Sequence, residues 1–297
     1  MGFSSWSDTA FRNLARSRAS SSAGEIFSKQ HAVDPLMSPY RIQLREARDS
    51  EHHPQSLPVI VAFDVTGSMG HIPAQFAKES LGLLMSQLLE SGWARDPQLL
   101  FGAVGDAVTD RAPLQVGQFE SGLEMDMWLT RIWLESGGGD IPESYLLAHW
   151  FAAYHTATDA WEKRGKKGYL FTIGDAPNKP FSSSHLRRVF GYAPTAPIDD
   201  VSVIAAAKEK WNTFHVLVSN TGKLPAASVV EPWQALLGPG LLVLDEHGAI
   251  NELIGATLGV CEGTLAREQA RELLEAAGVD AAVASEAVTQ MSQFEVG

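Results

Sequence analysis

The stretch that decides the fold runs from Pro58 to Gly70 and reads Pro-Val-Ile-Val-Ala-Phe-Asp-Val-Thr-Gly-Ser-Met-Gly. Its first six residues form a continuous, β-rich apolar run that ends at Asp64, which is typical of a strand buried on both faces of a parallel sheet. Beyond the glycine-containing turn, large apolar residues recur at helical spacing from Phe76 to Leu89. The stretch therefore predicts a strand, a tight turn that begins with an acid, and a helix.

The same alternation continues along the chain. Further strands are predicted at 99–104, 114–119, 168–173, 214–219 and 241–244, the second of them at a sheet edge. Helices are predicted at 124–133, from the glycine-rich loop 136–143 to about 160, and at 200–211, 231–237 and 251–258. Strands that alternate with helices predict one doubly wound, mostly parallel sheet, that is, an α/β fold of the Rossmann-like kind.

Two flanking segments differ from this α/β domain, which we expect to span residues 57–262. Residues 1–56 are interpreted as an N-terminal arm and linker, because Ser, Ala and Arg dominate the first thirty residues. Within this segment the alternation of Tyr40, Ile42 and Leu44 indicates an edge strand. Residues 263–297 hold two amphipathic stretches split by Gly278, which predict a C-terminal helical hairpin.

Composition narrows the classes of function. The 297 residues carry a formal net charge of −12 and are 45% apolar. Nucleic acid is therefore not expected to bind the body of the domain, because phosphates need a basic surface. The chain has no run of about 20 apolar residues, so we expect no membrane span. Cys261 is the single cysteine and no secretory leader is recognisable, which favours a cytoplasmic location.

Three acid-bearing loops follow elements that end at the same edge of the predicted sheet. They contain Asp64, Thr66 and Ser68 in the first loop, Asp140 in the second and Asp175 in the third. The carboxyl ends of parallel strands meet at one edge, so these side chains can converge. Their donors are carboxylates and hydroxyls without thiol or imidazole, which suits a hard cation such as Mg²⁺ or Mn²⁺.

These loops also resemble a known family. Residues 59–70 resemble the first strand and the metal-ion-dependent adhesion site of von Willebrand factor A domains, whose pattern is Asp-x-Ser/Thr-x-Ser at the end of a strand. The Gly-Gly-Gly-Asp-x-Pro-Glu loop at 137–143 resembles the second metal loop of a bacterial-type branch that has aspartate in place of threonine. Ile173-Gly-Asp-Ala-Pro177 resembles the third metal loop.

The resemblance implies a role for each of these residues. Thr66 and Ser68 would bind the metal directly, Asp64 and Asp175 would act largely through water, and Asp140 would take the threonine position. It further implies a non-enzymatic binding or scaffolding protein that engages a protein partner through the metal. Intracellular members of this kind resemble partners of AAA-type ATPases, or of kinases and phosphatases in the same gene cluster, within stress or defence assemblies.

An enzymatic alternative remains open. Asp-x-Thr-Gly after one strand and Gly-Asp after a later one also resemble the layout of haloacid-dehalogenase-type phosphotransferases. Asp64 would then be the nucleophile, Asp175 would hold magnesium, and Lys166 or Lys167 would be the charge partner. Position 66, however, lacks the second acid of the usual phosphatase pattern.

Three neighbouring residues have simpler interpretations. Glu143 follows Pro142 at an expected helix start, where an acid interacts favourably with the helix dipole. His149 and His155 fall on the helix after the second loop, and we interpret them as packed side chains rather than catalytic groups.

Overall fold

The computed structural model describes residues 4–29, 31–67, 69, 71–135, 141–219 and 224–294. Its strands are β1 (Arg45–Ala47), β2 (Leu57–Asp64), β3 (Pro97–Val104), β4 (Leu114–Val116), β5 (Thr156–Thr158), β6 (Gly168–Gly174), β7 (Trp211–Val218) and β8 (Leu241–Leu244). Its helices begin with α1 (Asp8–Arg18), α2 (Ala23–Ile26), α3 (His71–Gln75), the π-helical segment η1 (Phe76–Ser80), α4 (Leu81–Glu90), α5 (Glu124–Leu129) and α6 (Leu146–Tyr154). They continue with α7 (Asp159–Arg164), α8 (Ser183–Phe190), α9 (Asp200–Lys210), α10 (Ala227–Leu237), α11 (Ile250–Cys261), α12 (Arg267–Ala276) and α13 (Ala281–Met291), together with the short 3₁₀ segments η2 (Gly238–Gly240), η3 (His247–Ala249) and η4 (Ser292–Phe294).

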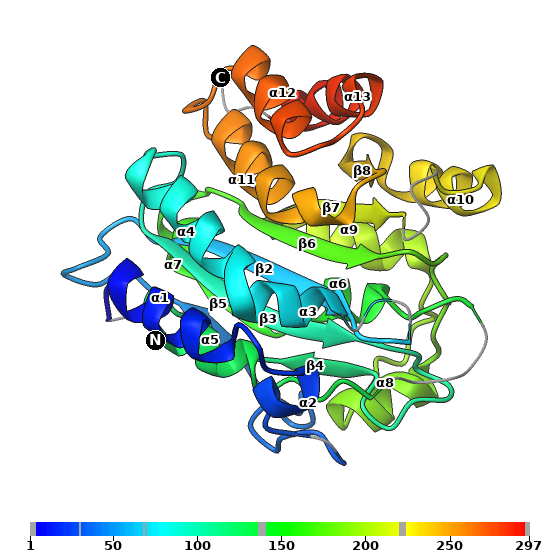
Figure 1. Ribbon diagram of the computed structural model, residues 1–297. Helices are drawn as coiled ribbons and strands as arrows, with labels where there is room; N and C mark the ends of the chain where they lie inside the picture. The colour runs from blue at the N-terminus through cyan, green and yellow to red at the C-terminus, as the bar shows by residue number, and fades with distance from the viewer. Residues whose placement is uncertain are drawn as a thin grey trace.

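One six-stranded sheet organises the molecule (Figure 1). Its strands lie in the order β4-β3-β2-β6-β7-β8, and every neighbouring pair is parallel except β3 with β4. The predicted doubly wound, mostly parallel α/β fold is confirmed. The expected edge strand after 114 is also present, and it is the antiparallel one.

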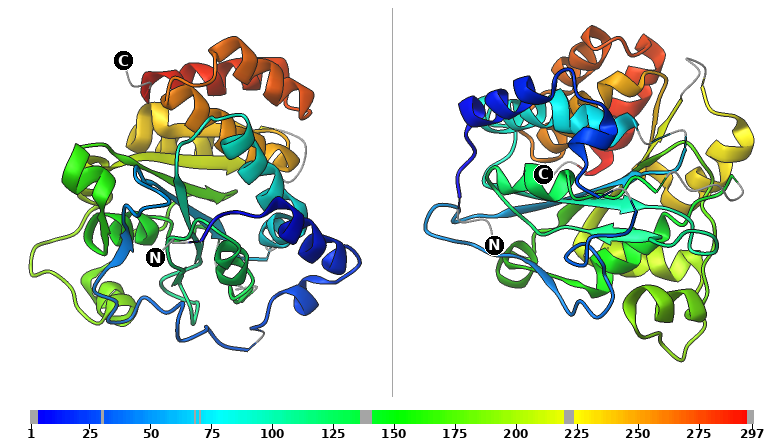
Figure 2. Two further views of the ribbon diagram at one scale, coloured as in Figure 1. Left: turned by 90° about the vertical axis from the view of Figure 1, so that its left-hand side faces the viewer. Right: turned by 60° about the horizontal axis from the view of Figure 1, so that its bottom comes forward.

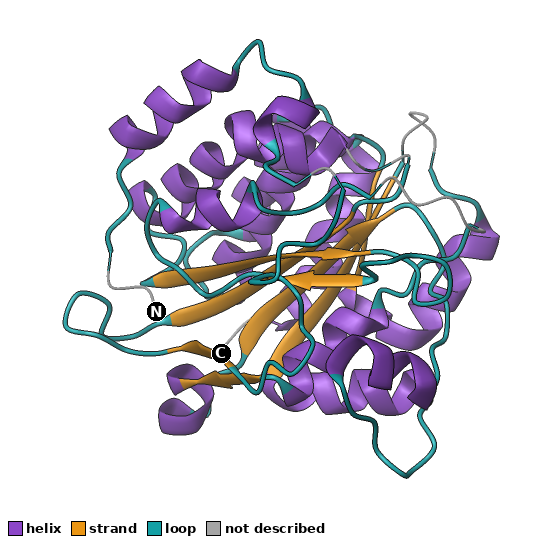
Figure 3. Ribbon diagram, turned by 90° about the horizontal axis from the view of Figure 1, so that it is seen from below, coloured by secondary structure: helices purple, strands orange, loops and turns teal. Residues whose placement is uncertain are grey.

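Helices cover both faces of this sheet (Figure 3). The reason is visible in β2, where every residue is buried. Val59, Val61 and Phe63 pack into one apolar cluster with α3, α4, α5 and α11, whereas Ile60 and Ala62 pack into a second cluster with α6, α8, α9 and α10. Because successive side chains of a strand point to opposite faces, an uninterrupted apolar run requires a layer on each side.

The order of the strands creates a switch point between β2 and β6. From β2 the chain moves outward to β3 and β4, and it then returns to the other side of β2 to form β6, β7 and β8. In open α/β sheets a crevice opens beyond the carboxyl ends of the two strands at which this reversal occurs. Asp64 ends β2, and Asp175 directly follows β6.

The N-terminal segment, which composition predicts to be an arm, contains a helix that packs on the body. Figure 2 shows α1 alongside the helical segment that follows β2. Phe11 is 2% exposed, and its ring lies so close to Gly82 that a Cβ atom there would approach a ring carbon to 2.5 Å. The guanidinium of Arg18 donates hydrogen bonds of 2.5 and 2.8 Å to the two carboxylate oxygens of Asp126.

Three local predictions were wrong. The alternating residues Tyr40 and Leu44 are exposed and form no strand, and the strand of this segment is β1, which pairs with β5 outside the main sheet. The helix expected to reach about residue 160 ends at Tyr154, because the β-branched residues of β5 pair with β1 instead. Trp211, expected at the end of a helix, begins β7.

The C-terminal segment forms the predicted pair of helices, α12 and α13. Leu274 and Met291 are fully buried in the cluster that also contains residues of α11. Gly278 lies between the two helices with a φ of +97°, a conformation that glycine adopts without strain. Among the described residues, no helix combines the length and apolar character needed to cross a lipid bilayer.

Candidate metal centre

Asp64 is the centre of the candidate site. Its side chain is fully buried at the carboxyl end of β2. One carboxylate oxygen, Oδ1, accepts a hydrogen bond of 2.8 Å from the backbone N–H of Thr66 and one of 2.5 Å from the Thr66 hydroxyl. Such a turn closed by an aspartate side chain fixes both the carboxylate and the backbone that follows it. The first and third residues of the predicted motif are therefore in contact.

Tyr145 holds the other oxygen of this carboxylate. Its hydroxyl donates a hydrogen bond of 2.5 Å to Oδ2 of Asp64, and the tyrosine is fully buried just before α6. Burial and the nearby charge of Asp64 raise the pKa of Tyr145 well above its usual value, so the phenol stays protonated and remains a donor. Gly174 makes room for it, because a Cβ atom there would lie 2.0 Å from the tyrosine hydroxyl.

Asp175 reaches the same edge from the neighbouring strand. Phe63 pairs with Ile173 across β2 and β6, so the residues that follow the two strands emerge side by side. Burial raises the pKa of Asp64 to about 6. The hydrogen bonds from Thr66 and Tyr145 oppose this shift, and the charge of Asp175 adds to it. The structure therefore brings Asp64, Thr66 and Asp175 together, whereas their roles as metal ligands stay a prediction.

The remaining predicted ligands are not described. Ser68 and Asp140 lie outside the described residues. Within the part of the chain that the structure describes, no group of three or more His, Cys, Asp or Glu side chains forms a ready-made metal site. Two of the five predicted ligands, Thr66 and Ser68, would contribute hydroxyl oxygens, so they do not belong to a group made of these four residue types.

Glu143 closes the second predicted metal loop, where the sequence pattern indicates an acid that interacts with the helix dipole and not a ligand. It precedes α6 by three residues, so it is not part of the first helical turn. Its side chain is 5% exposed, and within the described part of the chain its Oε2 atom has no hydrogen-bond partner. Burial, followed by the negative charges of Asp64, Asp110 and Asp106, raises the pKa of Glu143 to about 9. The positive charge of Lys179 opposes this shift but does not cancel it, so the buried carboxyl group favours its protonated form.

A further acidic loop follows β3 at the same sheet edge. Oδ2 of Asp110 accepts a hydrogen bond of 2.8 Å from the backbone N–H of Asp106. The ammonium of Lys179 lies 2.7 Å from Oδ2 of Asp106, and the backbone N–H of Lys179 donates to the carbonyl of Glu143. Despite the burial of Asp106, its hydrogen bonds with Lys179 and Thr109 lower its pKa. Lys179 thus connects this loop to the segment that carries Glu143.

The sequence pattern predicts the position of one of these surrounding acids. Asp106 follows a predicted parallel strand, so the rule that gathered Asp64 and Asp175 at one edge also applies to it. Tyr145 carries no such signal, because its place beside Asp64 depends on a contact 81 positions apart in the chain. Glu143 belongs to the second predicted metal loop, but its place there depends on tertiary contacts such as the bridge to Asn178.

The two histidines after the second loop are packed, as expected. His149 is fully buried on α6, and burial lowers its pKa to about 4. His155 stacks on the rings of Phe151 and Phe190, with ring centroids 5.9 and 4.7 Å away. Its Nδ1 atom lies 2.8 Å from the carbonyl oxygen of Ile42. Both rings fill space between elements of the fold.

The lysines proposed for the phosphotransferase alternative lie at the opposite end of the sheet. Lys166 and Lys167 precede β6, whereas Asp64 and Asp175 stand at the carboxyl ends of β2 and β6. Lys166 forms an ion pair with Glu262, and the ammonium of Lys167 donates a hydrogen bond of 2.6 Å to the carbonyl of Lys208. Neither lysine can act as a charge partner of Asp64 in this arrangement.

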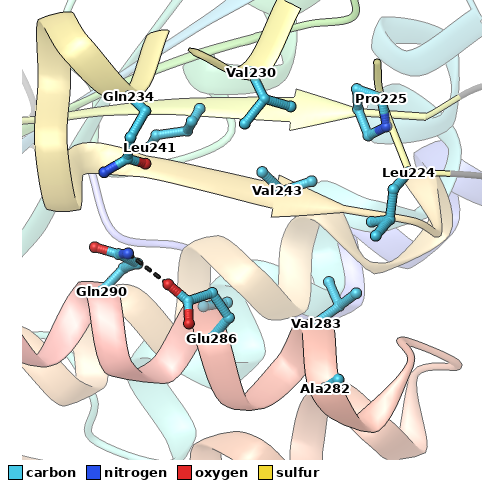
Figure 4. Close-up of a pocket in the computed structure, with 11 residues that line it drawn as sticks. Leu224, Pro225, Val230, Gln234, Leu241, Val243, Ala282, Val283, Glu286 and Gln290 are labelled. Atoms are coloured by element: carbon cyan, nitrogen blue, oxygen red, sulfur yellow. Dashed lines mark hydrogen bonds between the residues drawn. The ribbon is translucent and has the colours of Figure 1, made fainter. Parts of the chain in front are cut away.

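A cavity of about 370 Å³ lies away from these acids, between β8, α10 and α13 (Figure 4). Its lining includes Val230, Val243 and Val283. At one end Gln290 donates a hydrogen bond of 2.6 Å to Glu286. The chemistry of this mostly apolar space is unlike that of the acidic sheet edge, and none of the acids of that edge lines it.

Comparison with solved structures finds two crystal structures of the pilus adhesin SpaC from Lactobacillus rhamnosus GG. The open conformation is 8% identical to this chain with a TM-score of 0.45, and the match covers 77% of this chain and 31% of the adhesin chain. A second structure of that adhesin gives 8% identity, a TM-score of 0.44, and coverage of 77% and 32%. The chain thus spans about a third of the length of these adhesin chains. No protein-family model and no curated protein matches the chain.

Proposed function

We propose that the chain is a von Willebrand factor A-type protein that binds Mg²⁺ or Mn²⁺ at the carboxyl edge of its sheet and uses the ion to engage a protein partner. The observation that carries the proposal is the position of Asp64 at the switch point between β2 and β6, with Thr66 and Asp175 beside it. Ligands of doubly wound sheets bind at this point because loops and helix N-termini leave a crevice there.

The chemistry of the surrounding residues fits a hard divalent cation. The donors available from Asp64, Thr66, Asp175 and Glu143 are all oxygens, which magnesium and manganese prefer. Burial, and then the charges of neighbouring acids, raise the pKa values of Asp64 and Glu143, so ionising these carboxyl groups without a cation is unfavourable. The buried Oε2 atom of Glu143, which has no hydrogen-bond partner among the described residues, is an oxygen that a cation could take as a ligand. A bound cation would supply the positive charge and a coordination position for an acidic group of the partner.

The chain's own residues would orient this site. Tyr145 and the Thr66 backbone fix the Asp64 carboxylate in one position before any ion arrives. Hydrogen bonds that hold a ligand's side chain in this way strengthen metal binding, because the ligand needs little reorganisation. Ser68 and Asp140, which the family resemblance implies as ligands, would complete the ligand set.

The proposed partner is a protein, and the proposed location is the cytoplasm. An AAA-type ATPase, or a kinase or phosphatase encoded in the same gene cluster of a bacterial stress or defence system, is the partner that the family resemblance suggests. The proposal assigns no catalytic residue. The haloacid-dehalogenase-type alternative would need a charge partner other than Lys166 and Lys167.

One experiment tests metal dependence and partner capture together. The wild type and the double variant Asp64→Ala, Ser68→Ala would be immobilised and exposed to a lysate of the source cell with MgCl₂ or with a chelator. We expect one set of proteins to be retained by the wild type only when Mg²⁺ is present, and not by the variant. Retention that is the same with chelator, or the same on the variant, would refute metal-dependent capture. If the wild type releases phosphate from aryl phosphates and Asp64→Asn does not, the result would instead favour the phosphotransferase alternative.

A further inference from the structure

A small polar cleft lies on the same edge of the sheet, beyond β4. Asp64 pairs with Val104, and Val104 pairs with Leu114 at the start of β4. Two strand spacings, about 10 Å, therefore separate the metal centre from this position. The cleft has a volume of about 140 Å³, and Leu114 forms part of its wall together with Ser38, Tyr40, Arg111 and Arg188. This space is several times the ~30 Å³ that one water molecule occupies in the liquid.

The two arginines of the cleft are held in place by neutral groups. The guanidinium of Arg111 lies over the ring of Trp133, 5.3 Å from its centroid. Arg188, on α8, donates from Nη2 to the carbonyl oxygen of Ala107. Among the described residues, neither guanidinium forms an ion pair with a carboxylate, and no acidic side chain lines the cleft. Within the described part of a chain whose net charge is −12, these two positive charges are therefore not engaged in an ion pair.

The acids near this cleft are occupied by other partners. The carboxylate oxygens of Glu135 accept hydrogen bonds of 2.9 and 2.8 Å from the backbone N–H groups of Arg111 and Ala112. Asp34 lies 3.3 Å from a guanidinium nitrogen of Arg131 and 3.5 Å from the ammonium of Lys29. These contacts direct the neighbouring carboxylates toward groups other than Arg188 and the Arg111 guanidinium.

We infer that this cleft binds a phosphate group. A guanidinium presents a planar set of donors that matches two oxygens of an oxyanion, and a pair of them balances the two charges of a phosphate better than the single charge of a carboxylate. The hydroxyl of Ser38 accepts a hydrogen bond of 3.3 Å from the backbone N–H of Tyr40, so it keeps its own proton for donation. Inorganic phosphate and a phosphorylated side chain share this chemistry.

The binding of inorganic phosphate tests the site directly. Calorimetric titrations of the full chain in the presence of a chelator keep the result independent of the proposed metal centre. We expect the wild type to bind one phosphate, and Arg111→Gln and Arg188→Gln each to weaken binding about tenfold or more. Arg187→Gln is the matched control, because Arg187 precedes Arg188 on α8 and is exposed like it, but does not line the cleft. Circular dichroism establishes that each variant is folded.

A peptide arm separates the two sources of phosphate. A short phosphoserine peptide and its unphosphorylated form would be titrated against the same proteins. Tighter binding of the phosphopeptide than of inorganic phosphate, lost in Arg188→Gln, assigns the site to a modified side chain, and the reverse order assigns it to a free phosphate. If the wild type binds neither probe, or if Arg187→Gln weakens binding as much as Arg188→Gln, the inference is wrong. If Arg188→Gln alone loses its fold, Arg188→Lys replaces it, with weaker binding expected because the planar fork is gone.

Discussion

The hydroxyl of Tyr145 donates a hydrogen bond of 2.5 Å to Oδ2 of Asp64, across 81 positions of the sequence. The opposite oxygen of the carboxylate is held by Thr66. Both oxygens of a fully buried acid are thereby fixed by the protein before any ligand binds. A carboxylate oriented in this way is prepared to support a metal ion, directly or through a water molecule.

Tyr145→Phe tests this relationship. Removal of the hydroxyl leaves one oxygen of a buried carboxylate without its donor, so we expect a loss of about 2 kcal/mol in the free energy of unfolding in the absence of metal. We also expect magnesium to bind about tenfold more weakly, because the ligand is no longer oriented. Urea denaturation and Mg²⁺ titration measure the two effects. Tyr154→Phe, an exposed tyrosine on α6, should change neither, and equal effects of the two variants would contradict the assigned role.

Gly174→Ala approaches the same contact from the other strand. A Cβ atom at this position would lie 2.0 Å from the Tyr145 hydroxyl, and both groups are enclosed. We expect the tyrosine to be displaced, at a cost of about 2 kcal/mol in stability, together with a loss of magnesium affinity. Gly67→Ala is the control for stability without metal, since no described atom beyond the chain neighbours of Gly67 lies within 4 Å of the added Cβ. Thermal denaturation that finds the two variants equally stable would refute the clash.

The stability of the protein should depend on pH through His149. Burial lowers the pKa of His149 in the folded state to about 4, against about 6.5 in an unfolded chain. The unfolded state therefore binds this proton more tightly, and the contribution of His149 to stability falls as pH drops from 6.5 toward 4, whereas the raised pKa values of Asp64 and Glu143 act in the opposite direction. His149 alone contributes a decrease of about 3 kcal/mol over this range.

His149→Leu should make the pH profile shallower. Urea denaturation at several pH values between 7 and 4 measures the slope, and the exposed His52→Leu serves as the control. His215 is also buried with a lowered pKa, so part of the slope should remain. A His149→Leu profile that runs parallel to that of the wild type would show that this histidine is not responsible.

The docking of α1 on the body should contribute to stability. Phe11 is buried against the helix that follows the metal turn, so Phe11→Ala should cost about 3 kcal/mol. The exposed Asn13→Ala on the same helix is the control. Chemical denaturation measures both, and limited proteolysis should cleave the N-terminal helix of Phe11→Ala faster. Equal stability of the two variants would mean that α1 is not held by this side chain.

The fold was predictable because its decisive signals are local. The buried run of β2 and the helical spacing after it specify their own structure, and the later strands repeat the pattern. Prediction failed where nonlocal pairing competes with local propensity. Residues 156–158 were predicted to continue a helix, but they pair with β1, more than a hundred positions earlier in the chain.

The candidate site was predictable in part for the same reason. Asp64 and Asp175 follow strands, and the topology of a parallel sheet places such residues at one edge. Tyr145 and Glu143 reach Asp64 through a tertiary arrangement that no local spacing encodes. The need for glycine at position 174 follows only from the position of the Tyr145 side chain, which leaves no room for a Cβ atom there.

The most direct test of the metal centre is a calorimetric titration of the chelator-treated protein with MgCl₂. We expect the wild type to bind Mg²⁺ and to melt at a higher temperature in its presence, because a ligand that binds only the folded state stabilises it. Asp64→Asn should lose both effects, whereas Asp8→Asn on the surface of α1 should retain them. Magnesium binding of equal affinity in the wild type and in Asp64→Asn, or no binding of Mg²⁺ or Mn²⁺ to the wild type, would contradict the account.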